Sequence, residues 1–280
     1  MIIDIHTHAF PKVMRDNRAR FFPNEPGFKL LYAAPKSRLV GADETVAMMD
    51  RHGVDKCVIF GFPWRSADFF KLNNDYIIEA VNRHPDRLVG FCCMDPLHPG
   101  AAKEVERCLA AGLSGVGELA FYTSGIDDVC VKSLEPTMAL AETFHRPVML
   151  HTNEPVGHHY PGKSPNTLAQ IYGLVQRFCN NRIILAHWGG GIFFYALLKK
   201  EVRETLKNVW FDTAASPYLY QPQVYQQALA LAGPEKVLLG SDFPLLEPRR
   251  YLEEMDAAEL SETDKAAICG GNAAKLLNFS

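Results

Sequence analysis

Short runs of apolar residues recur along the chain, and longer amphipathic stretches separate them. Each run has about four to eight residues, is apolar at consecutive positions, and ends near Gly, Pro, Asp or Asn. This pattern is typical of parallel strands that are covered on both faces. The predicted strands are residues 1–6, 56–62, 87–94, 114–119, 147–151, 182–187, 208–213 and 236–241.

Helical periodicity fills most of the intervals between these strands. In residues 42–53, Asp43 is the expected N-cap and Gly53 follows the last turn. In residues 95–112, Pro99 stands early and Gly112 late, which is the usual asymmetry of a helix. The predicted helices are residues 42–53, 95–112, 133–146, 166–180, 221–233 and 261–277.

The alternation of eight strands with helices, without an internal repeat or a linker, predicts one (β/α)8 TIM barrel over residues 1–280. A doubly wound open sheet shows the same alternation and stays as the alternative. Residues 10–40 are rich in Pro, Arg and Phe, lack clean periodicity and are long for a connection. We interpret this segment as an irregular insertion after the first strand and a candidate lid over the barrel mouth.

Charge and composition narrow the classes of partner. The formal net charge is −3 at pH 7 and no run of Lys and Arg occurs, so we expect no nucleic acid. No apolar stretch approaches the roughly 20 residues that a membrane span needs. The seven cysteines include no Cys-x-x-Cys pair and the N-terminus has no basic signal region, so we expect a cytoplasmic protein. A small-molecule substrate is favoured, and a homo-oligomer remains open.

Side chains that bind metals or protons stand where the predicted strands end. In "MIIDIHTHAF", residues i and i+2 of a strand share a face, so Asp4, His6 and His8 should project together. The C-terminal strand ends form the active site of such a barrel. The polar residues at the other strand ends are Glu118, His151, His187, Asp212 and Asp242.

Imidazole and carboxylate groups are the ligands that suit Zn, Mn and Fe. The strand ends therefore predict a divalent metal, with zinc as the first choice and one or two ions. The alternative is that neighbouring side chains satisfy these buried groups by hydrogen bonds alone. Asp212 fits either a metal ligand or a hydrogen-bond acceptor. Asp4 lies one step deeper, so we expect it to orient the ligands rather than to bind the ion.

Other residues that follow the strands are candidate substrate contacts. Arg65 and Arg249 carry guanidinium groups that can bind a carboxylate through two hydrogen bonds, although solvated surface cations have the same sequence signature. Aromatic side chains can line an apolar pocket. The remaining candidates are Trp64, Tyr122, Trp188 and, in the loop after the fifth strand, His158.

Five motifs together resemble the amidohydrolase superfamily, and within it the amidohydrolase-2 branch. They are "DIHTH", "VMLH", "ILAHWGG", "LLGSDFP" and "GGNAAKLL", and they span nearly the whole chain. The resemblance implies a TIM-barrel enzyme that is a metal-dependent hydrolase or a non-oxidative decarboxylase of small carboxylated molecules. Carried over by position, it implies that the metal-site residues are His6, His8, His151, His187 and Asp242.

Glu118, in "GVGELAF", departs from the commonest pattern of that branch. It is similar to the strand-four glutamate of the TatD-like deoxyribonucleases, where this residue helps to hold two metals. The resemblance therefore adds Glu118 to the candidate ligands. It leaves the number of ions open between one and two.

The leading prediction for the reaction is hydrolysis of an amide, ester or lactone in a small carboxylated substrate. Metal-bound water would attack, Asp242 would shuttle the proton, and His187 would orient the water or polarise the scissile carbonyl. The principal alternative is metal-dependent non-oxidative decarboxylation, in which Asp242 moves protons without an attacking water. A phosphodiesterase and a non-catalytic binding protein rank below both.

Overall fold

The structure, a computed structural model, describes residues 1–279. Its eight strands pair in parallel in the order of the chain, from β1 to β8. All eight predicted strands are present; the first lies two residues later than predicted, and the other seven are one to a few residues shorter. They are β1 (Ile3–His8), β2 (Lys56–Phe60), β3 (Leu88–Cys92), β4 (Gly115–Leu119), β5 (Val148–Leu150), β6 (Ile183–Leu185), β7 (Val209–Asp212) and β8 (Val237–Leu238).

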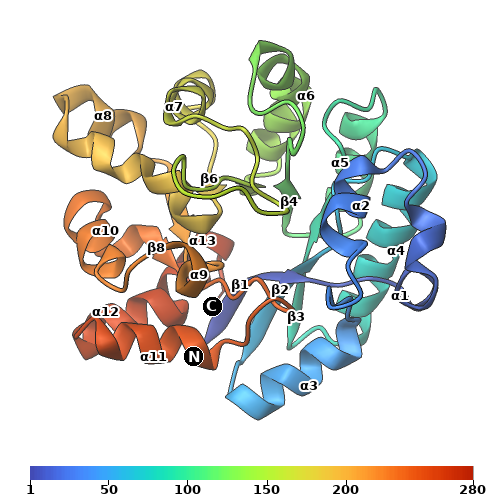
Figure 1. Ribbon diagram of the computed structural model, residues 1–280, viewed down its shortest axis with the longest axis horizontal. Helices are drawn as coiled ribbons and strands as arrows, with labels where there is room; N and C mark the ends of the chain where they lie inside the picture. Colours follow the sequence, from blue (N-terminus) through green and yellow to red (C-terminus); the bar gives the residue numbers. More distant parts are fainter. Residues whose placement is uncertain (280) are drawn as a thin grey trace.

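Backbone hydrogen bonds close the sheet between its last and first strands. The Ile5 amide donates to the Leu239 carbonyl at 2.9 Å, and the Asp242 amide donates to the His6 carbonyl at 2.9 Å. Figure 1 shows the helices placed around this ring of strands. The closure confirms the (β/α)8 barrel and is incompatible with the open doubly wound sheet.

The helices follow the strands and cover the outside of the barrel (Figure 1). Those of the first half are α1 (Lys12–Asp16), η1 (Arg18–Phe21), α2 (Pro26–Tyr32), α3 (Ala42–His52), α4 (Ala67–Arg83), α5 (Ala101–Ala110) and α6 (Asp128–Thr143). Those of the second half are α7 (Leu168–Arg177), η2 (His187–Leu197), α8 (Lys200–Thr205), α9 (Ser216–Leu219), α10 (Val224–Ala232), η3 (Pro234–Lys236), α11 (Arg249–Ala257), α12 (Glu262–Ala266), η4 (Ala267–Gly271) and α13 (Asn272–Leu277). Within the described residues, no helix is both long and apolar enough to cross a bilayer.

Two helices differ from the sequence prediction for identifiable reasons. The N-cap of α3 is Gly41, not Asp43, because the Glu44 carboxylate accepts the Gly41 amide at 2.9 Å and fixes the helix start there. Helix α4 was not predicted, since its buried face carries Asn73 and Asn74 among the apolar residues. The Asn73 amide group donates to the Ala9 carbonyl at 3.1 Å, so this buried polar side chain is satisfied by a hydrogen bond.

Residues 10–40, the insertion after the first strand, contain three short helices, α1, η1 and α2, joined by irregular segments. The side chains of Phe10 and Phe28 are fully buried, and Tyr32 at the end of α2 is 8% exposed. The Glu25 carboxylate accepts the backbone amide of Arg65 at 3.0 Å, which ties the segment to the loop after β2. In Figure 1 these first helices lie beside α4 and α5. The segment is therefore packed against the barrel as part of its core.

The first strand is irregular at the point where its polar residues begin. Asp4 pairs with Cys57 and Thr7 pairs with Ile59, so β1 holds one residue more than the facing stretch of β2. Asp4 consequently faces outward with Cys57, whereas the rings of His6 and His8 meet Phe60 inside the barrel. The prediction that Asp4 shares a face with both histidines is wrong, because a regular period of two does not survive this extra residue.

Candidate metal centre

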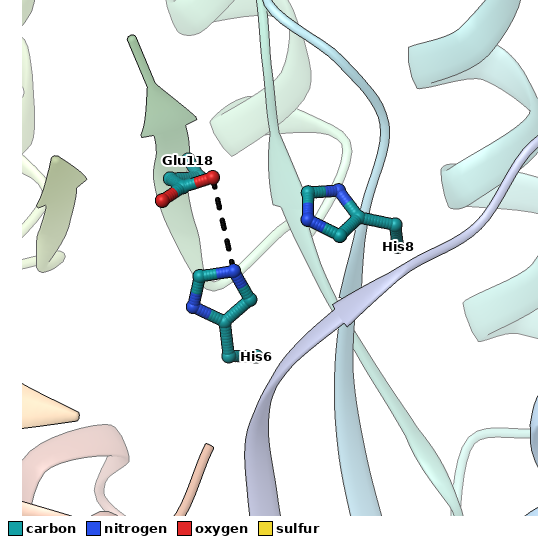
Figure 2. Close-up of side chains that lie close together, drawn as sticks. All are labelled: His6, His8 and Glu118. Atoms are coloured by element: carbon teal, nitrogen blue, oxygen red, sulfur yellow. Dashed lines mark ion pairs between the residues drawn. The ribbon is translucent and has the colours of Figure 1, made fainter. Parts of the chain in front are cut away.

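Six side chains meet at the C-terminal ends of the strands, just inside the barrel mouth. Their nitrogen and oxygen atoms form three overlapping groups, and the atoms of each group lie within 4.8 Å of one another. Figure 2 shows His6 and His8 of β1 directed toward Glu118 of β4. The six are His6, His8, Glu118, His151, His187 and Asp242, the same residues that the sequence predicted.

Hydrogen bonds to fixed acceptors orient both histidines of β1. His6 Nδ1 lies 2.8 Å from Asp212 Oδ2, and His8 Nδ1 lies 3.2 Å from the Gly61 carbonyl oxygen. Neither a carboxylate nor a carbonyl can donate, so Nδ1 carries the hydrogen in both rings. The Nε2 lone pairs therefore point into the cluster.

These lone pairs face negative charge. His6 Nε2 lies 3.7 Å from Glu118 Oε2 and 3.7 Å from Asp242 Oδ1, and it is buried without a hydrogen-bond partner. His8 Nε2 lies 3.2 Å from Asp242 Oδ1. A lone pair that faces a carboxylate in a buried site is stable only with a cation or a proton between them.

The other two histidines repeat this arrangement. His151 Nε2 donates to the Gly162 carbonyl at 2.8 Å, which leaves Nδ1 2.9 Å from Glu118 Oε1. His187 Nδ1 donates to the Ala214 carbonyl at 2.9 Å, which leaves Nε2 3.4 Å from Glu118 Oε1. All four imidazoles thus turn their second nitrogen toward the two carboxylates. The donor set fits a divalent ion that accepts nitrogen and oxygen ligands.

The pKa values of the cluster residues also indicate that the site favours positive charge. Burial alone would lower the pKa of His6, but Asp212 and Glu118 outweigh it and raise the pKa to about 10. Burial also opposes ionisation of Glu118, yet the charges of His151 and His6 hold its pKa well below the usual range. Among residues 1–279, every ion pair of Glu118 and Asp242 is with a histidine.

Residues behind the cluster hold it in place. Asp212 accepts the His187 backbone amide at 2.8 Å as well as the His6 ring, so it is a hydrogen-bond acceptor that positions two histidines. The Asp4 carboxylate accepts the Ser241 amide at 2.9 Å and the Ser241 hydroxyl, next to Asp242 in the chain. Asp4 therefore anchors the segment that carries Asp242.

Backbone strain marks the two residues to which the sequence assigned catalysis. His187 has φ 54° and Asp242 has φ 60°, a left-handed conformation that residues other than glycine rarely adopt. Such strain persists only where surrounding contacts enforce it, and it is concentrated at functional sites.

The structure brings one of the predicted aromatic substrate contacts to the cluster and buries two elsewhere. The ring of Tyr122 lies 5.1 Å from that of His151. Trp64 is fully buried and its indole N–H donates to Asn73 at 3.0 Å. Trp188 is also fully buried and donates to Ser216 at 3.0 Å. These two indoles are core residues with their only donor satisfied, which the sequence pattern did not distinguish from a pocket wall.

The predicted polar substrate contacts lie toward solvent. Arg65 is about half exposed and its Nε lies 3.6 Å from Asp95. Arg249, at the start of α11, pairs with Glu253 at 2.9 Å. His158 is exposed in the loop after β5. The structure does not bring these three into the cluster.

Sequence reasoning missed contributions from backbone groups and from two tyrosines. The carbonyls of Gly61, Gly162 and Ala214 fix three of the four imidazoles, and no side-chain pattern reveals them. Tyr220 donates to the His187 carbonyl at 3.2 Å. Tyr32 of α2 lies near enough to Asp242 and Glu118 that their charges contribute to raising its pKa. Only their positions in the folded chain identify these residues.

Comparison with known proteins adds independent information. The family model described as Amidohydrolase matches residues 3–279. The 2-amino-3-carboxymuconate-6-semialdehyde decarboxylase of Dictyostelium discoideum is 24% identical, over 99% of this chain and 91% of its own length. The gamma-resorcylate decarboxylase of Rhodococcus jostii is 24% identical, over 97% and 96% of the two chains.

A solved structure of similar fold is the 5-carboxyvanillate decarboxylase of Novosphingobium aromaticivorans, which contains manganese and 4-hydroxy-3-methoxy-5-nitrobenzoic acid. It has a TM-score of 0.77 and 16% identity, and the match covers 100% of this chain and 96% of that one. At this identity, the likeness establishes the shared fold.

The leading prediction of an amide, ester or lactone hydrolase is wrong, because these relatives are named as decarboxylases. The comparison supports the alternative that the sequence ranked second. The physical reason for the error is that both reactions use the same histidine and carboxylate ligands. Ligand motifs at strand ends therefore do not separate them.

Proposed function

Because the chain belongs to the amidohydrolase family, we propose that it is a metal-dependent, non-oxidative decarboxylase of a small aromatic or unsaturated carboxylic acid. The observation that carries this proposal is the orientation of the four imidazoles. Each has one nitrogen fixed by an acceptor and the other turned toward Glu118 or Asp242. The decarboxylase names of the relatives supply the choice of reaction.

His6, His8, His151 and Asp242 would hold the metal, with Glu118 available as a further ligand. The unpartnered, buried Nε2 of His6 supports this assignment, since an ion would give that atom a partner. When bound, the ion would supply a Lewis acid that anchors the substrate carboxylate. We propose zinc from the ligand chemistry. The Novosphingobium structure contains manganese, so the experiment below compares the two ions.

Decarboxylation exchanges a carbon–carbon bond for a carbon–hydrogen bond. The carbon that bears the carboxylate gains one proton, the bond to the carboxylate breaks, its electron pair returns to the carbon skeleton, and CO₂ leaves. We propose that Asp242 takes this proton up from solvent and delivers it to the carbon, which returns Asp242 to its carboxylate form. His187 can hold a proton at Nε2, because Nδ1 is committed to the Ala214 carbonyl.

The test is release of CO₂ from 2,6-dihydroxybenzoate, 6-methylsalicylate and 5-carboxyvanillate. The purified protein is stripped with a chelator and reloaded separately with Zn²⁺ and Mn²⁺. We expect CO₂ release from at least one acid, dependence on the metal, and one or two bound ions per chain. The double variant His6→Ala/His8→Ala should lose the metal and roughly 10³-fold or more of the activity.

His159→Ala is the matched control, since this histidine is exposed in the loop after β5. It should keep both metal and activity. Equal metal content in the wild type and the double variant would refute the assigned metal site. Conversion of these acids without CO₂ release would refute the decarboxylase assignment.

A further inference from the structure

Two tyrosines from distant parts of the chain stand beside the cluster. Tyr32 ends α2, in the segment that follows β1, and Tyr122 follows β4. Both rings pack on Phe62, with centroid distances of 6.1 Å for Tyr32 and 5.8 Å for Tyr122. Tyr122 also contacts the His151 ring at 5.1 Å. Phe62 therefore holds the two phenols on the same side of the site.

The packing that places these rings is close. Tyr32 lies 5.5 Å from the Phe10 ring, which is stacked at 6.5 Å on the ring of His8. A Cβ atom at Gly27 would come within 3.1 Å of Tyr122 Cδ2, so α2 passes directly beside this ring. The segment after β1 and the loop after β4 thus make one continuous aromatic wall next to His8 and His151.

The hydroxyl groups of Tyr32 and Tyr122 have no hydrogen-bond partner within residues 1–279, although Tyr32 is only 8% exposed. In the part of the chain that the structure describes, neither hydroxyl makes a hydrogen bond. The buried polar atoms that lack a partner do not include either oxygen. Each oxygen therefore reaches accessible space. Other tyrosines near the barrel mouth are satisfied, such as Tyr220 with the His187 carbonyl and Tyr251 with the Ser241 carbonyl.

The charges around the wall favour an uncharged ligand group. Burial, together with the carboxylates of Asp242 and Glu118, raises the pKa of Tyr32, so the phenol stays protonated and can donate or accept. Two cations near the barrel mouth are paired with carboxylates, whereas Arg38, whose guanidinium lies over the Phe243 ring, has no ion pair among residues 1–279. Lys163 binds Glu154 at 2.7 Å, and Arg65 lies 3.6 Å from Asp95. A second substrate carboxylate on this wall would meet two neutral phenols, neither of which balances its charge.

Resting on the decarboxylase function above, we propose that Tyr32 and Tyr122 bind an uncharged oxygen substituent of the substrate. They make the site specific for a hydroxylated aromatic monocarboxylic acid and against a dicarboxylic acid. A site built to hydrogen-bond a hydroxyl discriminates strongly against analogues that lack it, because its own polar groups are then left unpaired. Phe62 and the two tyrosyl rings supply the flat apolar surface for the aromatic ring.

The test measures dissociation constants by calorimetry on the metal-loaded protein, so it does not depend on turnover. The ligands are benzoate, the three monohydroxybenzoates and isophthalate. The proteins are the wild type, Tyr32→Phe, Tyr122→Phe and the matched control Tyr172→Phe, whose hydroxyl contacts Thr205 on the outer helices. Metal content and thermal unfolding of each variant establish that it is folded and loaded.

We expect the wild type to bind the best hydroxybenzoate about tenfold more tightly than benzoate or isophthalate. Tyr32→Phe and Tyr122→Phe should each weaken that hydroxybenzoate by about threefold to tenfold and change benzoate by less than about twofold. Tyr172→Phe should change neither. Arg38, whose guanidinium lies 5.9 Å from the Phe243 ring beside Asp242, is the rival determinant, and Arg38→Gln should not alter the preference.

Equal weakening of benzoate and hydroxybenzoate in the tyrosine variants would overturn the proposal, since the rings would then act only through packing. Tighter binding of isophthalate that depends on Arg38 would overturn it in favour of a dicarboxylic acid. CO₂ release is measured separately. If no acid is decarboxylated but the phenol-dependent preference for hydroxybenzoates is present, the decarboxylase assignment fails and the role of the tyrosines stands.

Discussion

The cluster at the strand ends and the segment of residues 10–40 beside it are stabilised by different forces. The cluster is polar, and hydrogen bonds to Asp212 and to backbone carbonyls fix its imidazoles. The segment is aromatic, and Phe28 packs at 4.3 Å from Trp64 and 4.8 Å from Tyr32. We therefore expect chemistry and substrate recognition to depend on two parts of the protein that variants can perturb separately.

The two regions also differ in how the sequence encodes them. Each cluster residue directly follows or ends an apolar run, so its place at a strand end is a local property. The aromatic residues of the segment are spaced irregularly and find their partners through contacts far along the chain, such as Phe62 and Trp64. Variants that affect one region without the other measure how independent they are.

The largest expected effect separates proton transfer from metal binding within the cluster. Asp242→Asn keeps the shape and one ligating oxygen but removes the basic carboxylate. We expect substantial metal to remain and kcat to fall by on the order of 10² to 10⁴, the usual scale of general acid–base catalysis. Metal analysis and steady-state rates on the same preparations check this prediction. Recovery of near-full activity with excess metal would show that Asp242 acts as a ligand only, and His187 would become the next candidate.

The second prediction perturbs the segment and spares the cluster. Phe28 is fully buried, and Phe28→Ala should lower the free energy of unfolding by about 3 to 5 kcal/mol through lost burial and a cavity. Denaturant unfolding measures this change. Metal affinity, titrated under native conditions, should stay within about threefold, since no cluster ligand contacts the removed ring.

Phe194→Ala is the matched control, because Phe194 is 45% exposed on η2. It should change stability by no more than about 0.5 kcal/mol. A loss of metal from Phe28→Ala that matches its loss of stability would mean that the segment and the cluster form a single cooperative unit.

The third prediction returns to the cluster through a residue that binds no metal in our assignment. Asp212→Asn replaces an acceptor that serves both His6 and the His187 amide with a group that also carries hydrogens. Metal affinity should fall about 10- to 100-fold, as is usual when the partner of a ligating histidine is removed. Asp128→Asn, in the exposed first turn of α6, is the control. Unchanged affinity in Asp212→Asn would show that the negative charge of Asp212 is not needed to position His6 and His187.

The barrel and the residues of the cluster could be predicted because both depend on local patterns. Short runs of consecutive apolar residues predict the strands. Because the active site of such a barrel forms at the strand ends, they also predict that His151 and Asp242 lie close together although they are far apart in sequence. The face of Asp4 could not be predicted, since the extra residue in β1 becomes visible only in its register with β2.

The lining of the site was harder to predict for a related reason. A tryptophan after a strand has the same local sequence whether it faces a pocket or, like Trp64, donates to a buried Asn73. Tyr32 lies in a segment without periodicity, so nothing local connects it with Tyr122. The prediction of the reaction was wrong because the ligands determine which kinds of ion can bind. They do not determine whether the site directs water at a bond, as in hydrolysis, or a proton at a carbon, as in decarboxylation.

The smallest expected effect concerns Arg249, the residue that the sequence offered as a carboxylate fork. Its side chain is 76% exposed and pairs with Glu253 one helical turn away, an arrangement worth only about 0.3 to 0.5 kcal/mol. Arg249→Gln should therefore leave kcat/KM within about twofold and stability within about 0.5 kcal/mol. Measurements at low and high salt separate general charge effects from direct contact, because only exposed charges at a distance are screened. An increase in KM of tenfold or more at both salt concentrations, with kcat unchanged, would place the guanidinium on the substrate. The rim after β8 would then belong with the cluster and the aromatic wall as a third part of the site.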